Sequence, residues 1–211
     1  MVAKFTLNNI DAIIFDLGGV VLNLDPQKTV DSFEKITGLT QFELVEASKH
    51  PAFNQFEKGE ISSDEFRQSL KKIFDSHIQD ELIDKAWNAM LLDLPNKRLN
   101  LIAALKHKYK TYVLSNTNEI HIKAFDKIVC EASSGNKIQD YFLEVYYSHK
   151  VGMRKPDAEI FEMVLEKNGL NPANTLFIDD TLEHIEAARK VGLKTWHLTN
   201  QEELYSAFGN G

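Results

Sequence analysis

Five short apolar runs, each ending at a polar residue, recur along the chain, at residues 12–15, 111–114, 145–147, 175–178 and 194–198. Their length and their content of β-branched and aromatic residues favour buried strands over helices. Segments with helical spacing separate the later runs, an alternation typical of a parallel sheet with crossover helices. The pattern therefore predicts an α/β fold: a three-layer sandwich around a parallel, Rossmann-like sheet.

Between the first two runs, only helical patterns occur. Signals for helix starts and stops divide this stretch, at Asp25-Pro26, Gly38, Thr40-x-x-Glu43 and Ser62-x-x-Glu65. Apolar residues recur at helical spacing in two stripes, Phe66, Leu70 and Phe74, then Ile83, Trp87 and Met90. We interpret both stripes as the core between packed helices. Residues 25–93 are thus predicted to form a helical cap domain inserted into an α/β core domain of residues 1–24 and 94–211.

Composition narrows the classes of protein that fit. Apolar residues make up 43% and charged residues 26% of the 211 residues, as in a globular protein. The net charge of −7 argues against nucleic acid or an acidic membrane as a partner. Residues 1–9 hold no apolar stretch typical of a signal peptide, and no run is long enough to span a membrane. The single cysteine, Cys130, is expected to be buried in a helix. We expect a cytoplasmic protein; the sequence predicts no particular oligomeric state.

Polar groups stand at or after the ends of four of these predicted strands, at Asp16, Ser115-Asn116, Lys155-Pro156 and Asp179-Asp180. Taken singly, such an aspartate can be a turn residue, such a serine a helix cap, and such a lysine a surface charge. Two adjacent carboxylates after an apolar strand, however, repel each other unless a cation offsets them. Ligands of open α/β sheets bind at the carboxyl ends of the strands. The four groups are therefore predicted to share one site.

These groups suit one chemistry. Mg²⁺ prefers oxygen ligands, which Asp16, Asp179 or Asp180 and a backbone carbonyl such as that of Gly18 can supply. The Ser115 hydroxyl, the Lys155 ammonium and backbone N–H groups after the second strand can neutralise a phosphoryl group. A carboxylate held against that phosphorus can act as a nucleophile and form an aspartyl-phosphate.

At these residues the chain closely resembles the haloacid dehalogenase superfamily, in its phosphatase branch. That superfamily has four ordered motifs, here matched by Asp16, Ser115, Lys155 and Asp179-Asp180. Its helical cap after the first strand matches the insertion at residues 25–93, and residues 57–62 and 65–66 resemble the cap of this subgroup. Residues 114–118 and 152–156 are similar to bacterial sugar-phosphate phosphatases of the α-D-glucose-1-phosphatase type.

The resemblance implies a role for each motif. Asp16 would be the nucleophile, and Ser115, Asn116 and Lys155 would bind phosphate, with Lys155 also serving catalysis. Mg²⁺ would be held by Asp16, the carbonyl of Gly18 and Asp179, with Asp180 close behind. The implied activity is Mg²⁺-dependent hydrolysis of a small phosphorylated metabolite, such as a hexose 1-phosphate, through an aspartyl-phosphate on Asp16.

Gly18 departs from the superfamily pattern, in which most phosphatases carry an aspartate as general acid and base at this position. Such a group is typically worth about 10²–10⁴-fold in rate. His121, His184 and Asp25 are the nearby alternatives by sequence, but a structural role is the better interpretation of each. The sequence therefore identifies no replacement.

Two other functions fit part of the pattern. Without the acid/base group, the chain could be a catalytically weak or inactive sugar-phosphate-binding or regulatory protein, and ligand-dependent thermal stabilisation without phosphate release would reveal it. A 2-haloacid dehalogenase also uses the nucleophilic aspartate but needs no metal, and it would leave Asp179 and Asp180 without a cation. Activity that is unaffected by EDTA would indicate the dehalogenase.

Overall fold

The computed structural model describes residues 9–209. Residues 1–8 and 210–211, which the sequence assigned to the core domain, lie outside the described residues. The strands are β1 (Ala12–Phe15), β2 (Lys110–Ser115), β3 (Glu144–Tyr147), β4 (Thr175–Asp179) and β5 (Lys194–His197). The helices are α1 (Pro26–Thr37), α2 (Gln41–Ala47), α3 (Pro51–Glu57), α4 (Ser63–Ile73), α5 (Asp80–Trp87), α6 (Asn96–Leu105), α7 (Glu119–Ala132), α8 (Ser148–Val151), α9 (Ala158–Asn168), α10 (Leu182–Lys190) and α11 (Glu202–Phe208), with short 3₁₀ turns η1 (Asn88–Met90), η2 (Ile138–Tyr141) and η3 (Pro172–Asn174).

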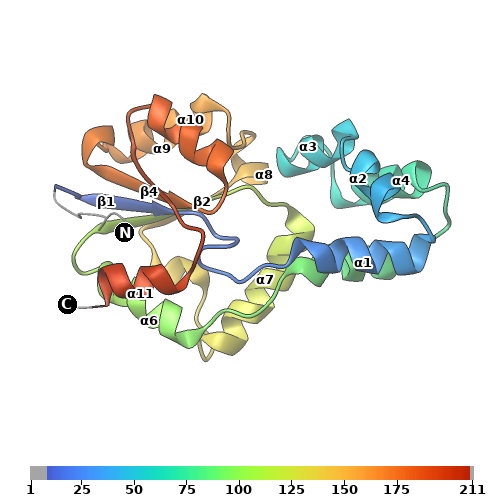
Figure 1. Cartoon of the computed structure of the whole chain (residues 1–211), viewed down its shortest axis with the longest axis horizontal. Helices are drawn as coiled ribbons and strands as arrows, with labels where there is room; N and C mark the ends of the chain where they lie inside the picture. Colours follow the sequence, from blue (N-terminus) through green and yellow to red (C-terminus); the bar gives the residue numbers. More distant parts are fainter. Residues whose placement is uncertain (1–8, 210–211) are drawn as a thin grey trace.

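The five strands form one sheet in the order β3-β2-β1-β4-β5, and every neighbouring pair is parallel (Figure 1). The five apolar runs of the sequence correspond to these strands. β1 lies at the centre, and its residue Phe15 pairs with Val113 of β2 and Ile178 of β4. The carboxyl ends of β1, β2 and β4 therefore meet at one edge, which is where a doubly wound sheet binds its ligands.

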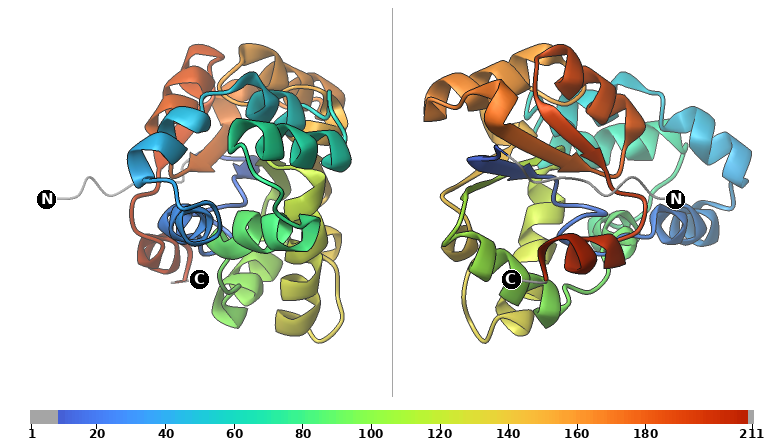
Figure 2. Two further views of the ribbon diagram at one scale, coloured as in Figure 1. Left: turned by 90° about the vertical axis from the view of Figure 1, so that its right-hand side faces the viewer. Right: turned by 60° about the vertical axis from the view of Figure 1, so that its left-hand side comes forward.

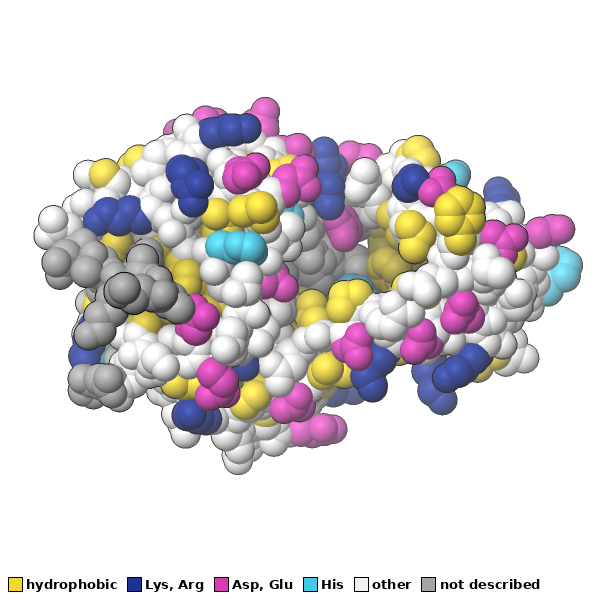
Figure 3. Space-filling model, viewed as in Figure 1, with side chains coloured by type: hydrophobic (Ala, Val, Ile, Leu, Met, Phe, Trp, Pro, Cys, Tyr) yellow, Lys and Arg dark blue, Asp and Glu magenta, His cyan; other side chains and the backbone are white. Residues whose placement is uncertain are grey.

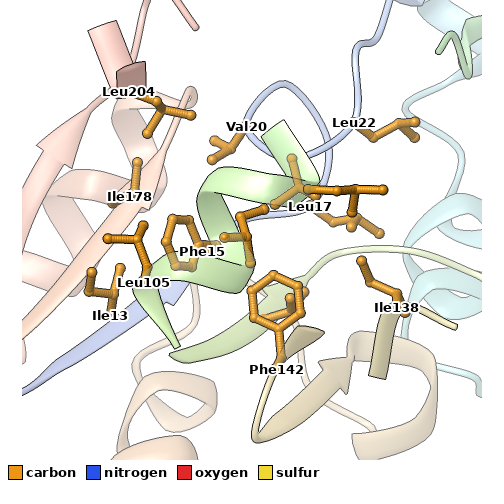
Figure 4. Close-up of a cluster of buried hydrophobic side chains, with 14 of the residues drawn as sticks. Ile13, Phe15, Leu17, Val20, Leu22, Leu105, Ile138, Phe142, Ile178 and Leu204 are labelled. Atoms are coloured by element: carbon orange, nitrogen blue, oxygen red, sulfur yellow. The ribbon is translucent and has the colours of Figure 1, made fainter. Parts of the chain in front are cut away.

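Alternate residues of β1 supply two separate cores. Ile13 and Phe15 pack with residues of α6, α7 and α11 on one face of the sheet (Figure 4). Ala12 and Ile14 pack with residues of α9 and α10 on the other. Figure 2 shows these two helical layers on opposite faces of the strands. The predicted three-layer α/β sandwich is thus confirmed, because a parallel sheet with both faces apolar is stable only when helices cover both.

Helices α1–α5 lie to one side of the sheet and have a hydrophobic cluster of their own (Figure 1). Phe66 is fully buried in it and stacks on Phe56, with ring centroids 4.2 Å apart. The predicted helix boundaries are confirmed: Asp25 caps α1, Gly38 ends it in the left-handed conformation, and both capping boxes are formed. Local side-chain hydrogen bonds thus set where these helices begin.

Two short antiparallel segments connect these helices to the sheet. Leu24 forms a bridge with Leu91, and the Asn23 N–H donates to the carbonyl of Asp93 over 3.1 Å. Buried Arg98 donates to the Val21 carbonyl at 3.0 Å and to the Asn23 side chain at 2.8 Å. The chain leaving β1 is therefore tied to the chain returning to β2.

The structure corrects two expectations about burial. In the second apolar stripe only Ile83 is fully buried; Trp87 packs against the cluster as expected but also lines a pocket, and half-buried Met90 lines the same pocket. Cys130 lies in α7 as expected, but on its exposed side. Among the described helices, none is both long and apolar enough to cross a lipid bilayer.

Candidate active site

Asp16 is placed at the carboxyl edge of the sheet by the turn that follows β1. Its N–H donates to the carbonyl of Ile178 at 2.8 Å, which extends the strand pairing by one residue. The next turn depends on Gly19, which has a φ of +72° and packs against the Asp180 carboxylate. A Cβ at Gly19 would lie 2.1 Å from Asp180 Oδ2. Only glycine allows this backbone conformation and this close approach together.

Lys155 is completely buried, which rules out its alternative interpretation as a surface charge. Its Nζ donates to Asp16 Oδ1 at 2.8 Å and to Asp179 Oδ2 at 2.7 Å. The ammonium also lies 5.4 Å from the centre of the Phe177 ring, on the strand that carries Asp179. Two motifs separated by 139 residues in the sequence, Asp16 and Lys155, are therefore in direct contact.

Asn116 and Ser115 have different functions in the fold. The Asn116 amide donates to the Lys155 carbonyl and accepts from the Lys155 N–H, both at 2.8 Å. Its side chain thus fixes the loop that carries Lys155. Ser115 is not the cap of α7, because Asn118 takes that place and accepts from the His121 N–H at 3.0 Å. The Ser115 hydroxyl is buried beside the pocket described below.

The site carries more negative charge than its lysine offsets. Burial raises the pKa of Asp16 to about 7 against the attraction of Lys155, and repulsion from Asp179 adds to the rise. Burial also raises the pKa of Asp180, again with repulsion from Asp179. Asp179 itself is buried, yet Lys155 and the hydrogen bond from His184 outweigh that effect and lower its pKa to about 2. The ammonium thus stabilises Asp179 most, and a further cation would relieve the other two carboxylates.

The donor set fits a magnesium ion. One oxygen from each of Asp16, Asp179 and Asp180 lies within 4.8 Å of the others. Lys155 binds Oδ1 of Asp16 and Oδ2 of Asp179, which leaves Oδ2 of Asp16 to a cation. Asp179 Oδ1 accepts from the Thr181 N–H at 2.8 Å and keeps a further lone pair for a metal. Hard carboxylate oxygens without a nitrogen or sulfur donor are what Mg²⁺ selects. The carboxylates of Asp16, Asp179 and Asp180 are therefore suitable ligands, and the Gly18 carbonyl stays a prediction of the sequence.

The raised pKa of Asp16 predicts how stability varies with pH. Its pKa of about 7 in the folded chain lies above the ordinary 3.8, so the stability it contributes is present below about pH 4 and is lost as the pH rises through 7. In EDTA, the free energy of unfolding of the wild type should therefore fall between about pH 5 and 8 relative to Asp16→Asn. Urea unfolding of both proteins at about pH 5 and about pH 8 measures this difference in the free energy of unfolding. Parallel curves for the two proteins would contradict the buried, proton-binding Asp16.

A cavity of about 190 Å³ opens from this site towards helices α3 and α5. Figure 3 shows the surface hollowed between the sheet-containing part and α1–α5. Gly18, Ser115 and Asn116 lie at its inner end, and apolar side chains such as Leu24 and Met90 form much of its wall. Leu24 also explains Gly18: a Cβ there would lie 2.4 Å from Leu24 Cδ1. A leucine methyl group thus takes the space into which a side chain at position 18 would extend.

The three residues considered as replacements for the acid/base group have structural contacts. His121 stacks on Trp87 with ring centroids 5.0 Å apart, and burial lowers its pKa to about 4. His184 Nδ1 lies 3.0 Å from Asp179 Oδ2, and Asp25 accepts from the Gln27 N–H at the start of α1. His121 also lines the cavity, which its sequence position alone did not indicate.

Glu57 is a charged lining residue that the sequence did not place in the site. Its carboxylate Oε2 accepts a hydrogen bond from Nε of Arg154 at 2.9 Å, and Arg154 directly precedes Lys155 in the sequence. The nearby turn at Gly59 touches the core directly, because a Cβ there would lie 2.1 Å from the carbonyl oxygen of His149. The only signal in the sequence was the similarity of residues 57–62 to a family cap, which does not identify a contact.

Comparisons with known proteins identify phosphatases among the similar sequences and a related enzyme among the solved structures. A D-ribitol-5-phosphate phosphatase from Bacteroides thetaiotaomicron is 31% identical over 89% of this chain and 91% of its own. A sesquiterpene phosphatase from Aspergillus oryzae is 28% identical over 90% of each chain. Among solved structures, a HAD family enzyme from B. thetaiotaomicron in complex with magnesium and inorganic phosphate is 37% identical, with a TM-score of 0.76 over 89% of this chain and 93% of that one.

The match to a family model extends over most of the fold. The model, described as haloacid dehalogenase-like hydrolase, covers residues 10–192, which include all four motifs and the helices between β1 and β2. The chain therefore belongs to the haloacid dehalogenase-like hydrolase family.

Proposed function

We propose that this protein is a Mg²⁺-dependent phosphatase that hydrolyses a small phosphomonoester through an aspartyl-phosphate on Asp16. The observation that carries the proposal is the buried Lys155 ammonium between Asp16 and Asp179, at 2.8 and 2.7 Å, with the carboxylate of Asp180 beside them. Burying charged groups is costly even when they are paired, so three carboxylates around one buried ammonium favour a chemical role over a purely structural one.

The proposed roles follow from the contacts. Lys155 orients the Asp16 carboxylate through Oδ1, and one oxygen of this carboxylate attacks phosphorus. The Ser115 hydroxyl, the Asn116 N–H and Lys155 bind the phosphoryl oxygens. Asp16, the Gly18 carbonyl, Asp179 and Asp180 would hold Mg²⁺. When bound, the metal supplies positive charge that offsets the phosphoryl oxygens and the site's carboxylates. These residues position the phosphoryl group and neutralise its charge, which is most of what phosphoryl transfer requires.

For the substrate we propose a phosphorylated sugar or related polyol, such as a hexose 1-phosphate. The similarity to a D-ribitol-5-phosphate phosphatase supports this class. We further propose that residues 25–93 act as a cap domain whose helices α3 and α5 close the cavity over the leaving group. Helices α3 and α5 contribute Glu57 and Trp87 to the cavity wall, which supports the proposed role of residues 25–93 as a cap domain. Closure would keep water from the reacting phosphate until the ester bond has broken.

The proposal is tested by phosphate release from a panel of sugar, polyol and other small phosphomonoesters, with Mg²⁺ and with EDTA. We expect release that requires Mg²⁺ and is absent in Asp16→Asn. Thermal stabilisation by the same esters without any release would indicate the binding or regulatory protein instead. Release of halide from a 2-haloacid in EDTA would indicate the dehalogenase.

Gly18→Asp tests how the site manages without an acid/base aspartate. Gly18 has an ordinary backbone conformation, so only Leu24 opposes the new side chain, with its Cδ1 2.4 Å from the position of the Cβ. We therefore expect the single variant to change turnover little, and Gly18→Asp with Leu24→Ala to raise kcat by about 10-fold or more. Mg²⁺ affinity, measured by calorimetry, should persist in both. Loss of Mg²⁺ binding would show that glycine is needed there for packing.

A further inference from the structure

The cavity beside the phosphate site has an unusual distribution of charge. Glu57 and His121 are the ionisable side chains among its described lining residues. The burial that lowers the pKa of His121 to about 4 leaves that ring neutral at pH 7. Among the described lining residues, Glu57 is therefore the charged side chain that the cavity wall presents to a leaving group, and it is partly offset by Arg154 behind it.

Two cations, Arg154 and Lys58, lie near Glu57 in space or along the chain, and neither lines the cavity. Arg154 uses its Nε to bind Glu57 Oε2 at 2.9 Å and does not line this cavity. Lys58 points to Asp157, with Nζ 3.3 Å from Oδ2, on the outer side. Within residues 9–209, no hydrogen bond to Glu57 Oε1 is found. One carboxylate oxygen thus remains to accept a hydroxyl group or to repel an anion.

We propose that Glu57 makes the enzyme selective for leaving groups without negative charge: neutral, hydroxyl-bearing skeletons are accepted, and leaving groups with a carboxylate or a second phosphate are rejected. The inference rests on the proposed phosphatase function and specifies its substrate class. A carboxylate brought to the apolar wall formed by Leu24, Trp87 and Met90 would lose water and meet Glu57, because no lysine or arginine is among the described lining residues. Neither cost applies to a hydroxyl group, which can donate to Oε1.

Arg154 makes the selectivity reversible by mutation. In the wild type, its guanidinium is neutralised by Glu57. Removing the charge of Glu57 leaves the Arg154 guanidinium without its partner, directly behind a residue that lines the cavity, so that it can attract an acidic leaving group. Removing Arg154 leaves Glu57 unpaired and strengthens the repulsion. The two partners of one ion pair are therefore predicted to shift substrate choice in opposite directions, which a purely structural ion pair would not do.

The test compares kcat/KM for glycerol 3-phosphate and 3-phosphoglycerate, two esters of similar size that differ in a carboxylate. We expect the wild type to prefer the neutral leaving group by at least about 10-fold. Glu57→Gln should reduce this preference by about 10-fold, mainly through KM for 3-phosphoglycerate, and Arg154→Gln should increase it. Glu60→Gln is the matched control, because Glu60 is exposed on the same turn and does not line this cavity.

The outcomes separate the two proposals. If Glu57→Gln and Arg154→Gln leave the preference unchanged, or shift it in the same direction, the inference is overturned while the phosphatase function stands. Arg154→Gln alone still decides the matter if Glu57→Gln does not fold. Absence of Mg²⁺-dependent release from every ester of the panel would refute the phosphatase function, and the inference would fall with it.

Discussion

Asp16→Asn is expected to lower Mg²⁺-dependent phosphate release on the order of 10⁴–10⁶-fold, the range found when a catalytic nucleophile is removed. An amide cannot attack phosphorus, and it is a much poorer metal ligand than a carboxylate. The shape of the side chain is nearly unchanged, and an amide oxygen can still accept from Lys155, whose Nζ lies 2.8 Å from Asp16 Oδ1. The fold should therefore survive.

Steady-state phosphate release measures the loss of turnover in Asp16→Asn. Circular dichroism and thermal unfolding in EDTA show whether the variant keeps its fold. Because burial raises the pKa of Asp16, the neutral amide should not destabilise the metal-free protein at pH 8. Retained turnover in Asp16→Asn would remove the nucleophile assignment. A variant that fails to fold would instead show that the Asp16–Lys155 pair is mainly structural.

Lys155→Met is the change expected to affect stability most. Methionine fits the space of the lysine stem but leaves Asp16 and Asp179 facing each other without the ammonium, which is completely buried. Breaking a buried ion pair by removing one partner typically costs about 3–5 kcal/mol. Phosphate release should be lost as well, since Lys155 is proposed to orient Asp16 and to bind the phosphoryl group.

Urea unfolding in EDTA gives the stability change, with Lys127→Met on the exposed side of α7 as the control. Mg²⁺ should restore part of the loss, because it supplies the missing positive charge to the same carboxylates. The double variant Asp16→Asn/Lys155→Met should lose less free energy of unfolding than the sum of the losses in the two single variants. Asp16→Asn removes one uncompensated charge, so it should even stabilise the Lys155→Met protein. Equal stability of Lys155→Met and Lys127→Met would contradict the proposed charge balance.

The local features of this fold could be predicted from the sequence because their causes lie within a few residues. The strands follow from short apolar runs, and the helix starts at Asp25, Thr40 and Ser62 follow from side chains that bond backbone groups two or three residues away. The meeting of Asp16 with Asp179 could also be anticipated, since both end parallel strands of one sheet, whose carboxyl ends lie at one edge. These inferences need only the strand pattern and the direction of the chain.

The remaining features depend on contacts between residues far apart in the sequence, and only the tertiary structure decided them. The burial of Lys155, the use of the Asn116 side chain to hold its loop, and the Leu24 methyl group beside Gly18 are set by packing, not by neighbours in the chain. The same is true of Glu57 and Arg154, which are 97 residues apart and meet only because α3 packs beside the catalytic edge. The sequence by itself determined which groups end the strands and so which chemistry is available. The tertiary structure decided how their charges are balanced and what lines the space for the leaving group, because burial and close packing depend on which distant segments come together.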